Sequence, residues 1–160
     1  MAVILICGKI CSGKTTYSKK LARELRAVRL SCDEITLALF GPDAGEFHDT
    51  MVERTFNYLL KKSVEIHESG ISVIMDYGFW QETDRQEADE FYRLHNIVPE
   101  WHYIDTPNDV WEKSVIKRNA AILHGEVEDY YIDEGLMKKF GAMFEPPIRE
   151  EIDVWYINEY

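Results

Sequence analysis

The sequence has little cysteine, no long apolar run and few basic residues, and each of these absences excludes a class of protein. Its 160 residues include three cysteines, Cys7, Cys11 and Cys32, with no C-x-x-C pair and no cysteine–histidine cluster at zinc-ligand spacing. Isolated thiols in odd number argue against a disulfide-stapled secreted domain and predict a reducing, cytoplasmic location. No apolar run reaches the roughly 18 residues of a membrane helix. Lysines follow the apolar residues 1–6 directly, without a signal-peptide cleavage site.

The balance of charges narrows the range of partners. The chain has 18 lysines and arginines against 29 aspartates and glutamates, which gives a formal net charge of −11. Such acidity argues against a broad surface for nucleic acid or anionic membranes, although it leaves room for a small phosphate site. Hydrophobic residues make up 46% of the chain, enough for one core. We therefore predict a single domain over residues 1–160, with neither nucleic acid nor a membrane as its partner.

Two kinds of apolar segment alternate along the chain. Short runs rich in β-branched residues predict strands at residues 3–6, 28–31, 71–75, 98–104 and 152–157. Apolar stripes of helical period predict helices at residues 14–26, 33–40, 44–68, 81–95, 107–123 and 136–144, the fifth of them capped by Thr106. The polar residues 125–135 predict a loop. Strands that alternate with helices predict an α/β fold, in which helices cover both faces of a parallel sheet.

One motif carries specific chemistry. The segment Gly8-Lys9-Ile10-Cys11-Ser12-Gly13-Lys14-Thr15 matches G-x-x-x-x-G-K-[ST] between a predicted strand and a predicted helix. The two glycines let the backbone curl, so that its N–H groups point inward as an anion nest to which the helix N-terminus adds its positive end. Lys14 supplies a charge to the β- and γ-phosphates, and the Thr15 hydroxyl ligates Mg²⁺. The motif therefore predicts a site for a nucleoside triphosphate with Mg²⁺.

Further segments follow this motif in the order found in a known group of enzymes: residues 28–34, Ile74-Met75-Asp76 with Arg85, residues 104–107, Lys117-Arg118-Asn119 and residues 144–147. With them the chain resembles the small P-loop kinases, which include polynucleotide 5′-kinase, gluconate kinase, chloramphenicol phosphotransferase and the zeta toxins. The resemblance implies a three-layer P-loop NTPase fold, sheet order 2-3-1-4-5, a lid around residues 118–135, and both substrates at the carboxyl ends of the strands. It also implies ATP and Mg²⁺ as cofactors, with a nucleotide site at Gly8, Lys9, Ile10, Cys11, Ser12, Gly13, Lys14, Thr15, Thr16 and Arg118.

Asp33 follows the second predicted strand, where the kinases of this group place a carboxylate beside the acceptor hydroxyl. A carboxylate there would accept the hydroxyl proton or orient the hydroxyl for in-line attack. The residues alone allow another role, because Ser31-Cys32-Asp33-Glu34 has the form of a capping box in which Asp33 only favours the helix dipole. These kinases often carry an arginine three residues further on, where this chain has Thr36; this difference weakens the case for an anionic acceptor.

The end of the third predicted strand holds candidate metal and substrate residues. Asp76 stands at a Walker-B-like position, where it would hold Mg²⁺ through water, or else serve as an ordinary turn residue. Tyr77, Phe79 and Trp80 would form a wall of the acceptor pocket or pack under the next helix. Arg85 lies in the first turn of that helix; its family counterpart holds phosphate or acceptor, and a simple surface arginine is the alternative.

Arg118 is the candidate for the arginine that stabilises charge on the transferring phosphoryl group, because it lies on the helix that enters the expected lid. The alternative is an exposed helix residue without a catalytic role. The lid departs from the pattern of these kinases, since residues 126–134 contain five acidic residues and no basic one. An acidic lid would repel ATP unless it faces away from the site or binds a cationic acceptor.

Together these residues predict an ATP-dependent kinase that transfers the γ-phosphoryl group of MgATP to a hydroxyl group of a small molecule. Lys14, Asp33 and Arg118 would carry catalysis, and Thr15 and Asp76 would hold the metal ion. The residues expected to contact the acceptor are Asp33, Asp76, Tyr77, Phe79 and Arg85. Two alternatives stay open: a 5′-hydroxyl polynucleotide kinase, which the net charge disfavours, and an ATP-binding regulatory module with little turnover.

Overall fold

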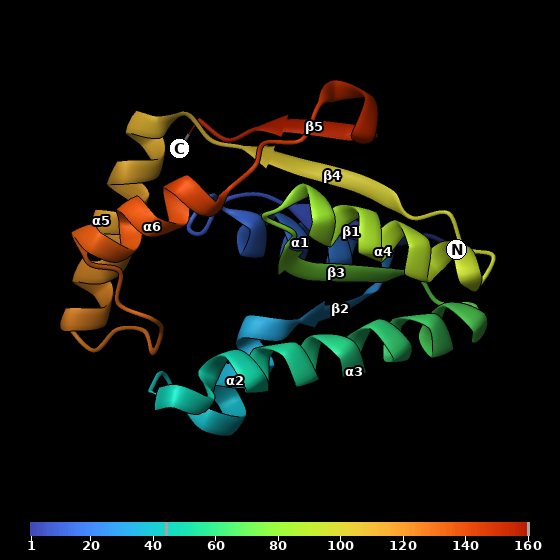
Figure 1. Ribbon diagram of the computed structural model, residues 1–160, viewed down its shortest axis with the longest axis horizontal. Helices are drawn as coiled ribbons and strands as arrows, with labels where there is room; N and C mark the ends of the chain where they lie inside the picture. The colour runs from blue at the N-terminus through green and yellow to red at the C-terminus, as the bar shows by residue number, and fades with distance from the viewer. Residues whose placement is uncertain (44, 160) are drawn as a thin grey trace.

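Parallel strands form the centre of the molecule, as Figure 1 shows for the computed structural model, which describes residues 1–43 and 45–159. The strands are β1 (Val3–Cys7), β2 (Val28–Ser31), β3 (Val73–Gly78), β4 (Glu100–Asp105) and β5 (Val154–Ile157). They lie in the order β2-β3-β1-β4-β5, and every neighbouring pair is parallel. The predicted sheet order is therefore confirmed. The order reverses at β1, so the carboxyl end of β1 lies at the switch point where ligands bind in such sheets.

The helices begin and end close to the predicted residues. They are α1 (Lys14–Leu25), α2 (Cys32–Phe40), α3 (His48–Glu68), α4 (Glu82–Leu94), α5 (Asn108–Leu123) and α6 (Glu134–Met143), with 3₁₀ turns η1 (Gly45–Phe47) and η2 (Arg149–Glu151). Ala44, the predicted start of the third helix, lies outside the described residues. α6 begins two residues before its predicted start, because the Asp133 carboxylate caps it by accepting the Leu136 N–H at 2.8 Å. Within the described part of the chain, no helix is both long and apolar enough to span a membrane.

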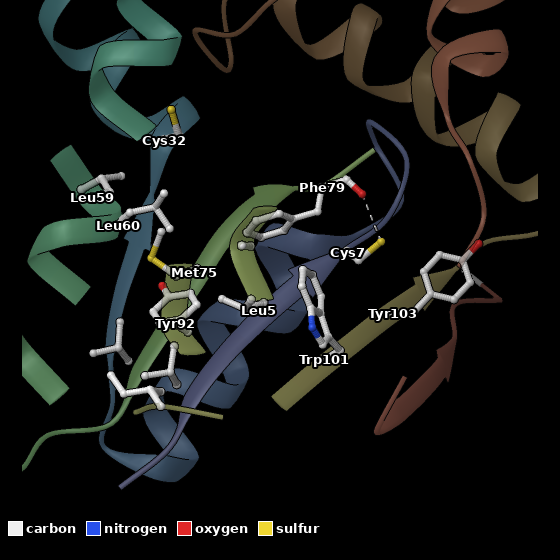
Figure 2. Close-up of a cluster of buried hydrophobic side chains, with 14 of the residues drawn as sticks. Leu5, Cys7, Cys32, Leu59, Leu60, Met75, Phe79, Tyr92, Trp101 and Tyr103 are labelled. Atoms are coloured by element: carbon white, nitrogen blue, oxygen red, sulfur yellow. Dashed lines mark hydrogen bonds between the residues drawn. The ribbon is translucent and has the colours of Figure 1, made fainter. Parts of the chain in front are cut away.

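Both faces of the sheet are buried, because successive side chains along a strand point to opposite sides. Leu5 lies on one face, in a core that α3 and α4 cover with Leu59 and Tyr92 (Figure 2). Ile4 lies on the other face, in a smaller core that α1 covers with Leu21. The arrangement of helix, sheet and helix is the predicted three-layer fold.

Two local predictions are wrong. β3 continues to Gly78, beyond its predicted end at residue 75, so Asp76 is a strand residue paired with Ile6 and not a turn residue. Thr106 does not cap α5, whose N-cap is Pro107. The Thr106 hydroxyl instead donates to the carbonyl oxygen of Ser12 at 2.9 Å. In this case a partner distant in sequence replaces the local hydrogen bond that the capping pattern favoured.

Leu5 allows a test of the described core, because its side chain is fully buried at the centre of β1. We expect Leu5→Ala to lower the free energy of unfolding by about 2–5 kcal/mol, since the truncation removes apolar contacts and leaves a cavity. The control Leu94→Ala, at a residue that is 71% exposed, should change it by less than about 0.5 kcal/mol. Urea unfolding of both variants measures the difference, and equal effects would contradict the described core.

Candidate functional site

The segment 8–15 forms a curled loop between β1 and α1. Gly8 and Gly13 have positive φ angles of 157° and 94°, a region that a residue without a Cβ adopts readily. A Cβ on Gly8 would also lie 2.9 Å from the backbone oxygen of Ile104. The loop leads directly into α1, whose first N–H groups have no partner within the helix. The predicted anion nest therefore has the backbone shape that it needs.

Lys14 holds the two sides of this loop together. Its side chain is 9% exposed, and Nζ donates to the carbonyl oxygens of Gly8 at 2.9 Å and Lys9 at 2.5 Å. Burial lowers the pKa of Lys14, while the carboxylates of Asp76 and Asp33 act in the opposite direction. A desolvated ammonium group beside free N–H groups is suited to bind an anion, because phosphate would replace the solvation that the lysine has lost.

Three side chains from distant segments hold the carbonyl groups of the loop from outside. Thr106 Oγ1 and Asn158 Nδ2 both donate to the Ser12 carbonyl, at 2.9 and 2.8 Å. Trp111 Nε1 donates to the Ile10 carbonyl at 2.7 Å. Because these donors bind the carbonyl groups of the loop, the N–H groups of the loop stay available for a ligand. Trp111 and Asn158 were not identified from the sequence as residues of the site. The only sequence signal near them was the match of residues 104–107 to the family pattern.

Arg118 reaches the loop from α5. Its Nη1 donates to the Cys11 Sγ at 3.1 Å, and its guanidinium forms an ion pair with Asp129 in the segment between α5 and α6. The Arg118 side chain is 24% exposed and lines the same cleft as the loop. Two of the five lid acids thus have structural partners, because Asp129 binds Arg118 and Asp133 caps α6.

Asp33 and Asp76 lie at the carboxyl ends of β2 and β3 and differ in their surroundings. Asp76 is 5% exposed and accepts hydrogen bonds from Ser18 Oγ and Arg29 Nη1, both at 2.8 Å. Asp33 lies in the first turn of α2 and lines the cleft, and its carboxylate has no hydrogen-bond or ion-pair partner among residues 1–43 and 45–159. Enclosure by the protein raises the pKa of Asp33; Lys14 lowers it, and Asp76 raises it.

The aromatic residues after Asp76 divide between the cleft and the core. Tyr77 stacks on Phe56 of α3, with ring centroids 3.9 Å apart, and both rings line the cleft. Trp80 also lines it and packs on Phe140 of α6, with centroids 5.1 Å apart. Phe79 is 1% exposed and belongs mainly to the core (Figure 2). Tyr77 and Trp80 therefore form part of the cleft wall, which was one expected role, and Phe79 packs mainly in the core, which was the other.

Arg85 is not among the residues that line the cleft. It is 5% exposed, and its Nη1 donates to the carbonyl oxygens of Phe79 at 3.3 Å and Glu145 at 3.0 Å. Its Nε lies 3.4 Å from a carboxylate oxygen of Glu151. These contacts join the start of α4 to the segment before β5, so the position of Arg85 supports a structural role and neither of the roles that the sequence favoured.

The cleft, of about 1850 Å³, brings together the expected residues Lys14, Thr15, Asp33, Asp76, Tyr77 and Arg118. Its volume exceeds the roughly 300–1,000 Å³ of a pocket for one small ligand, so two substrates have room side by side. Among the residues that the structure describes, no three acidic, histidine or cysteine side chains gather closely enough to hold a metal ion. The oxygens of Thr15 and Asp76 nevertheless suit Mg²⁺, which often takes only one or two protein ligands beside phosphate and water.

A phosphate-binding loop at the switch point of a parallel sheet of order 2-3-1-4-5 defines the class: this is a P-loop NTPase-like domain. The family model for the AAA domain, AAA_33, matches residues 3–147, and the chain belongs to this family. The chain matches none of the curated proteins by sequence.

Solved structures of several kinases share the fold. A protein from Chloroflexus aurantiacus J-10-fl, provisionally named a kinase, is 21% identical over 99% of this chain and 84% of its own, with a TM-score of 0.75. The APS kinase of Mycobacterium tuberculosis, solved with AMPPNP and APS, is 18% identical over 99% and 89%, with a TM-score of 0.69. A gluconokinase from Sinorhizobium meliloti 1021 is 13% identical over 99% and 82%, with a TM-score of 0.62. The resemblance to small P-loop kinases is thereby confirmed as one of fold.

Gly8→Ala tests whether the loop backbone forms the phosphate site. The added Cβ would meet the Ile104 oxygen at 2.9 Å in a backbone conformation of positive φ. We expect strain of about 1–3 kcal/mol, seen as an approximately tenfold or larger loss of affinity for ATP. Gly135→Ala, in α6 and without positive φ, is the control and should bind ATP as the parent does. Titration with a fluorescent ATP analogue measures both, and unchanged binding by Gly8→Ala would contradict the described loop.

Proposed function

We propose that the protein is an ATP-dependent kinase that transfers the γ-phosphoryl group of MgATP to a hydroxyl group of a small molecule. The observation that carries this proposal is that one cleft contains the phosphate-binding loop, Lys14, Arg118 and the unpartnered carboxylate of Asp33. A triphosphate on the loop and a hydroxyl at Asp33 would share that cavity, as in-line transfer requires. Fold neighbours named as kinases of small molecules, among them one solved with AMPPNP and APS, support the proposal.

Each residue has a role that follows from its chemistry. Lys14 would exchange its two carbonyl contacts for oxygens of the β- and γ-phosphates, and Arg118 would leave Asp129 to contact the transferring group. The acceptor oxygen would bond to the γ-phosphorus as the bond to the β–γ bridging oxygen breaks. The hydroxyl proton would pass to Asp33 and then to solvent, leaving ADP and a phosphate ester.

The Mg²⁺ that accompanies ATP would neutralise charge on the β- and γ-phosphates. The Thr15 hydroxyl would ligate it directly, and Asp76 would hold it through water. Ser18 and Arg29 already orient the Asp76 carboxylate, which is the arrangement that outer partners give to a metal-site residue.

The alternatives have less support. A polynucleotide acceptor needs clustered cations, whereas this chain has a net charge of −11, and the RNA repair complex of similar fold matches over only 43% of its own chain. A regulatory module would hold ATP without turnover.

The cysteines Cys7, Cys11 and Cys32 are free thiols, which supports a reducing compartment such as the cytoplasm.

The central test is Mg²⁺-dependent ADP formation across a panel of sugars, amino sugars, nucleosides and 5′-hydroxyl oligonucleotides. We expect Lys14→Ala to abolish the acceptor-stimulated rate, and Asp33→Asn to lower it by about 10²–10⁴-fold while ATP still binds. Lys19→Ala and Asp109→Asn, both exposed and outside the cleft, are the controls and should keep the parent rate. Tight ATP binding without stimulation by any acceptor would instead favour the regulatory module.

The pH dependence of the rate should show an acidic limb set by Asp33. Enclosure raises the pKa of this carboxyl, so the active carboxylate is lost as the pH falls through a value above the ordinary Asp pKa of about 3.9. The rate should therefore decline at higher pH than the ordinary pKa of an aspartate would dictate. Profiles of kcat for the parent and Asp33→Asn test this, and an unchanged acidic limb in the variant would assign the limb to another group.

A further inference from the structure

The two halves of the cleft carry opposite charge. Lys14 and Arg118 lie at the loop, where Asp76 and Asp129 already have arginine partners. On the walls around the other half, formed by α2, α3, α4, α6 and their loops, Lys139 is the one lysine or arginine among the described lining residues. Six carboxylates line the same walls: Asp33, Asp43, Asp49, Glu53, Asp84 and Glu87.

Local structure accounts for only some of these acids. Asp84 belongs to the capping box of α4, and Asp49 lies in the first turn of α3, where the helix dipole favours it. Glu53 and Glu87 lie in the second turns of these helices, and their carboxylates have no hydrogen-bond or ion-pair partner in the described part of the chain. Glu53 is four residues from Asp49, and Glu87 is three from Asp84, spacings at which like charges repel. Interactions within these helices therefore do not account for the acids at these two positions.

Acids from three different helices line the cleft together with Tyr77: Asp33 from α2, Glu53 from α3 and Asp84 from α4. Burial raises the pKa of the Tyr77 hydroxyl to about 12, with smaller contributions from Cys32, Asp84, Asp33 and Glu53. The Tyr77 ring stacks on Phe56 and lines the cleft. An aromatic ring that lines a cleft together with carboxylates is a suitable site for an ammonium group, which gains both the ring quadrupole and the ion pairs.

The nature of the cation follows from how these carboxylates are spaced. No three acidic, histidine or cysteine side chains among residues 1–43 and 45–159 are close enough together to hold a metal ion. An organic cation needs no such tight cluster, because it carries its charge on a larger frame that also contacts the rings of Tyr77 and Trp80. The five lid acids that suggested a cationic acceptor in the sequence contribute less, since Asp129 and Asp133 have partners of their own.

We infer that the acceptor is an amino alcohol, of the size of an amino sugar, whose hydroxyl lies at Asp33 while its ammonium group lies beside Tyr77 in the acidic half of the cleft. The inference rests on the proposed kinase activity and specifies its substrate class. An anionic acceptor would face the repulsion of these carboxylates, and a neutral one would gain no ion pair from them.

Matched acceptors that differ in one amine test the substrate class: D-glucosamine against D-glucose, and 2-amino-1,3-propanediol against glycerol, with gluconate as the anion. ADP formation at pH 7 and low salt gives kcat/KM for each. We expect the amine of each pair to exceed its uncharged partner by about tenfold or more, the size expected of a desolvated ammonium on an aromatic and acidic site. Equal or faster transfer to glucose, glycerol or gluconate would leave the kinase standing and overturn the inference.

Glu53→Gln tests the site itself. We expect it to raise KM for the preferred amine by about fivefold relative to its uncharged partner, mainly without loss of kcat. Its melting temperature should stay equal or rise, because the repulsion with Asp49 is removed, so a folding defect is separable. Glu68→Gln, at the exposed end of α3 and outside the cleft, is the matched control and should change neither quantity. A ratio of amine to neutral acceptor that Glu53→Gln leaves unmoved would contradict the inference.

Calorimetry with AMPPNP bound separates the two proposals if none of these acceptors is phosphorylated. Tighter binding of glucosamine than of glucose, weakened in Glu53→Gln, would support the cationic pocket while the proposed activity fails. Equal binding of the two sugars would overturn the inference.

Discussion

The phosphate-binding loop depends on one constraint: its carbonyl groups must find hydrogen-bond donors within the protein if its N–H groups are to face a ligand. Lys14 binds two of these carbonyls from within the loop. Thr106 and Asn158 bind the Ser12 carbonyl, and Trp111 binds that of Ile10. These donors follow β4, lie on α5 and follow β5, so the loop takes its shape only when that side of the sheet is assembled (Figure 1). Nucleotide binding and completion of the fold are therefore linked.

The same cleft separates charge in a way that suits two different substrates. The loop half offers N–H groups and the buried ammonium of Lys14, which favour a triphosphate. The opposite half offers carboxylates from α2, α3 and α4 together with the ring of Tyr77. Asp129 pairs with Arg118 at the boundary between the halves, so the arginine that would serve the nucleotide is neutralised until a phosphate competes for it. A strongly acidic protein can in this way keep a local site for the most anionic of common substrates.

Side-chain roles that depend on local spacing could be predicted, and roles that depend on distant partners could not. The Ser31 cap is confirmed, its Oγ accepting the Glu34 N–H at 3.4 Å, because a capping residue and its partner lie within one turn. Thr106 fitted a capping pattern equally well, yet its hydroxyl binds a carbonyl 94 residues away. Arg85 has its backbone partners in the segment after Asp76 and at Glu145, and the second of these lies 60 residues away. No periodicity in the sequence encodes such pairs.

The sequence by itself determined the class of the protein. Alternating periodicity dictates a parallel α/β sheet, and the spacing of Gly8, Gly13, Lys14 and Thr15 dictates a phosphate loop, because both follow from interactions between residues near one another in the chain. Only the tertiary structure decided which acids meet in the cleft. Asp33, Glu53 and Asp84 lie on three helices and line one cleft with Tyr77 once these helices pack against the sheet. The acceptor specificity that we propose would depend on that packing, since charges act through space and not along the chain.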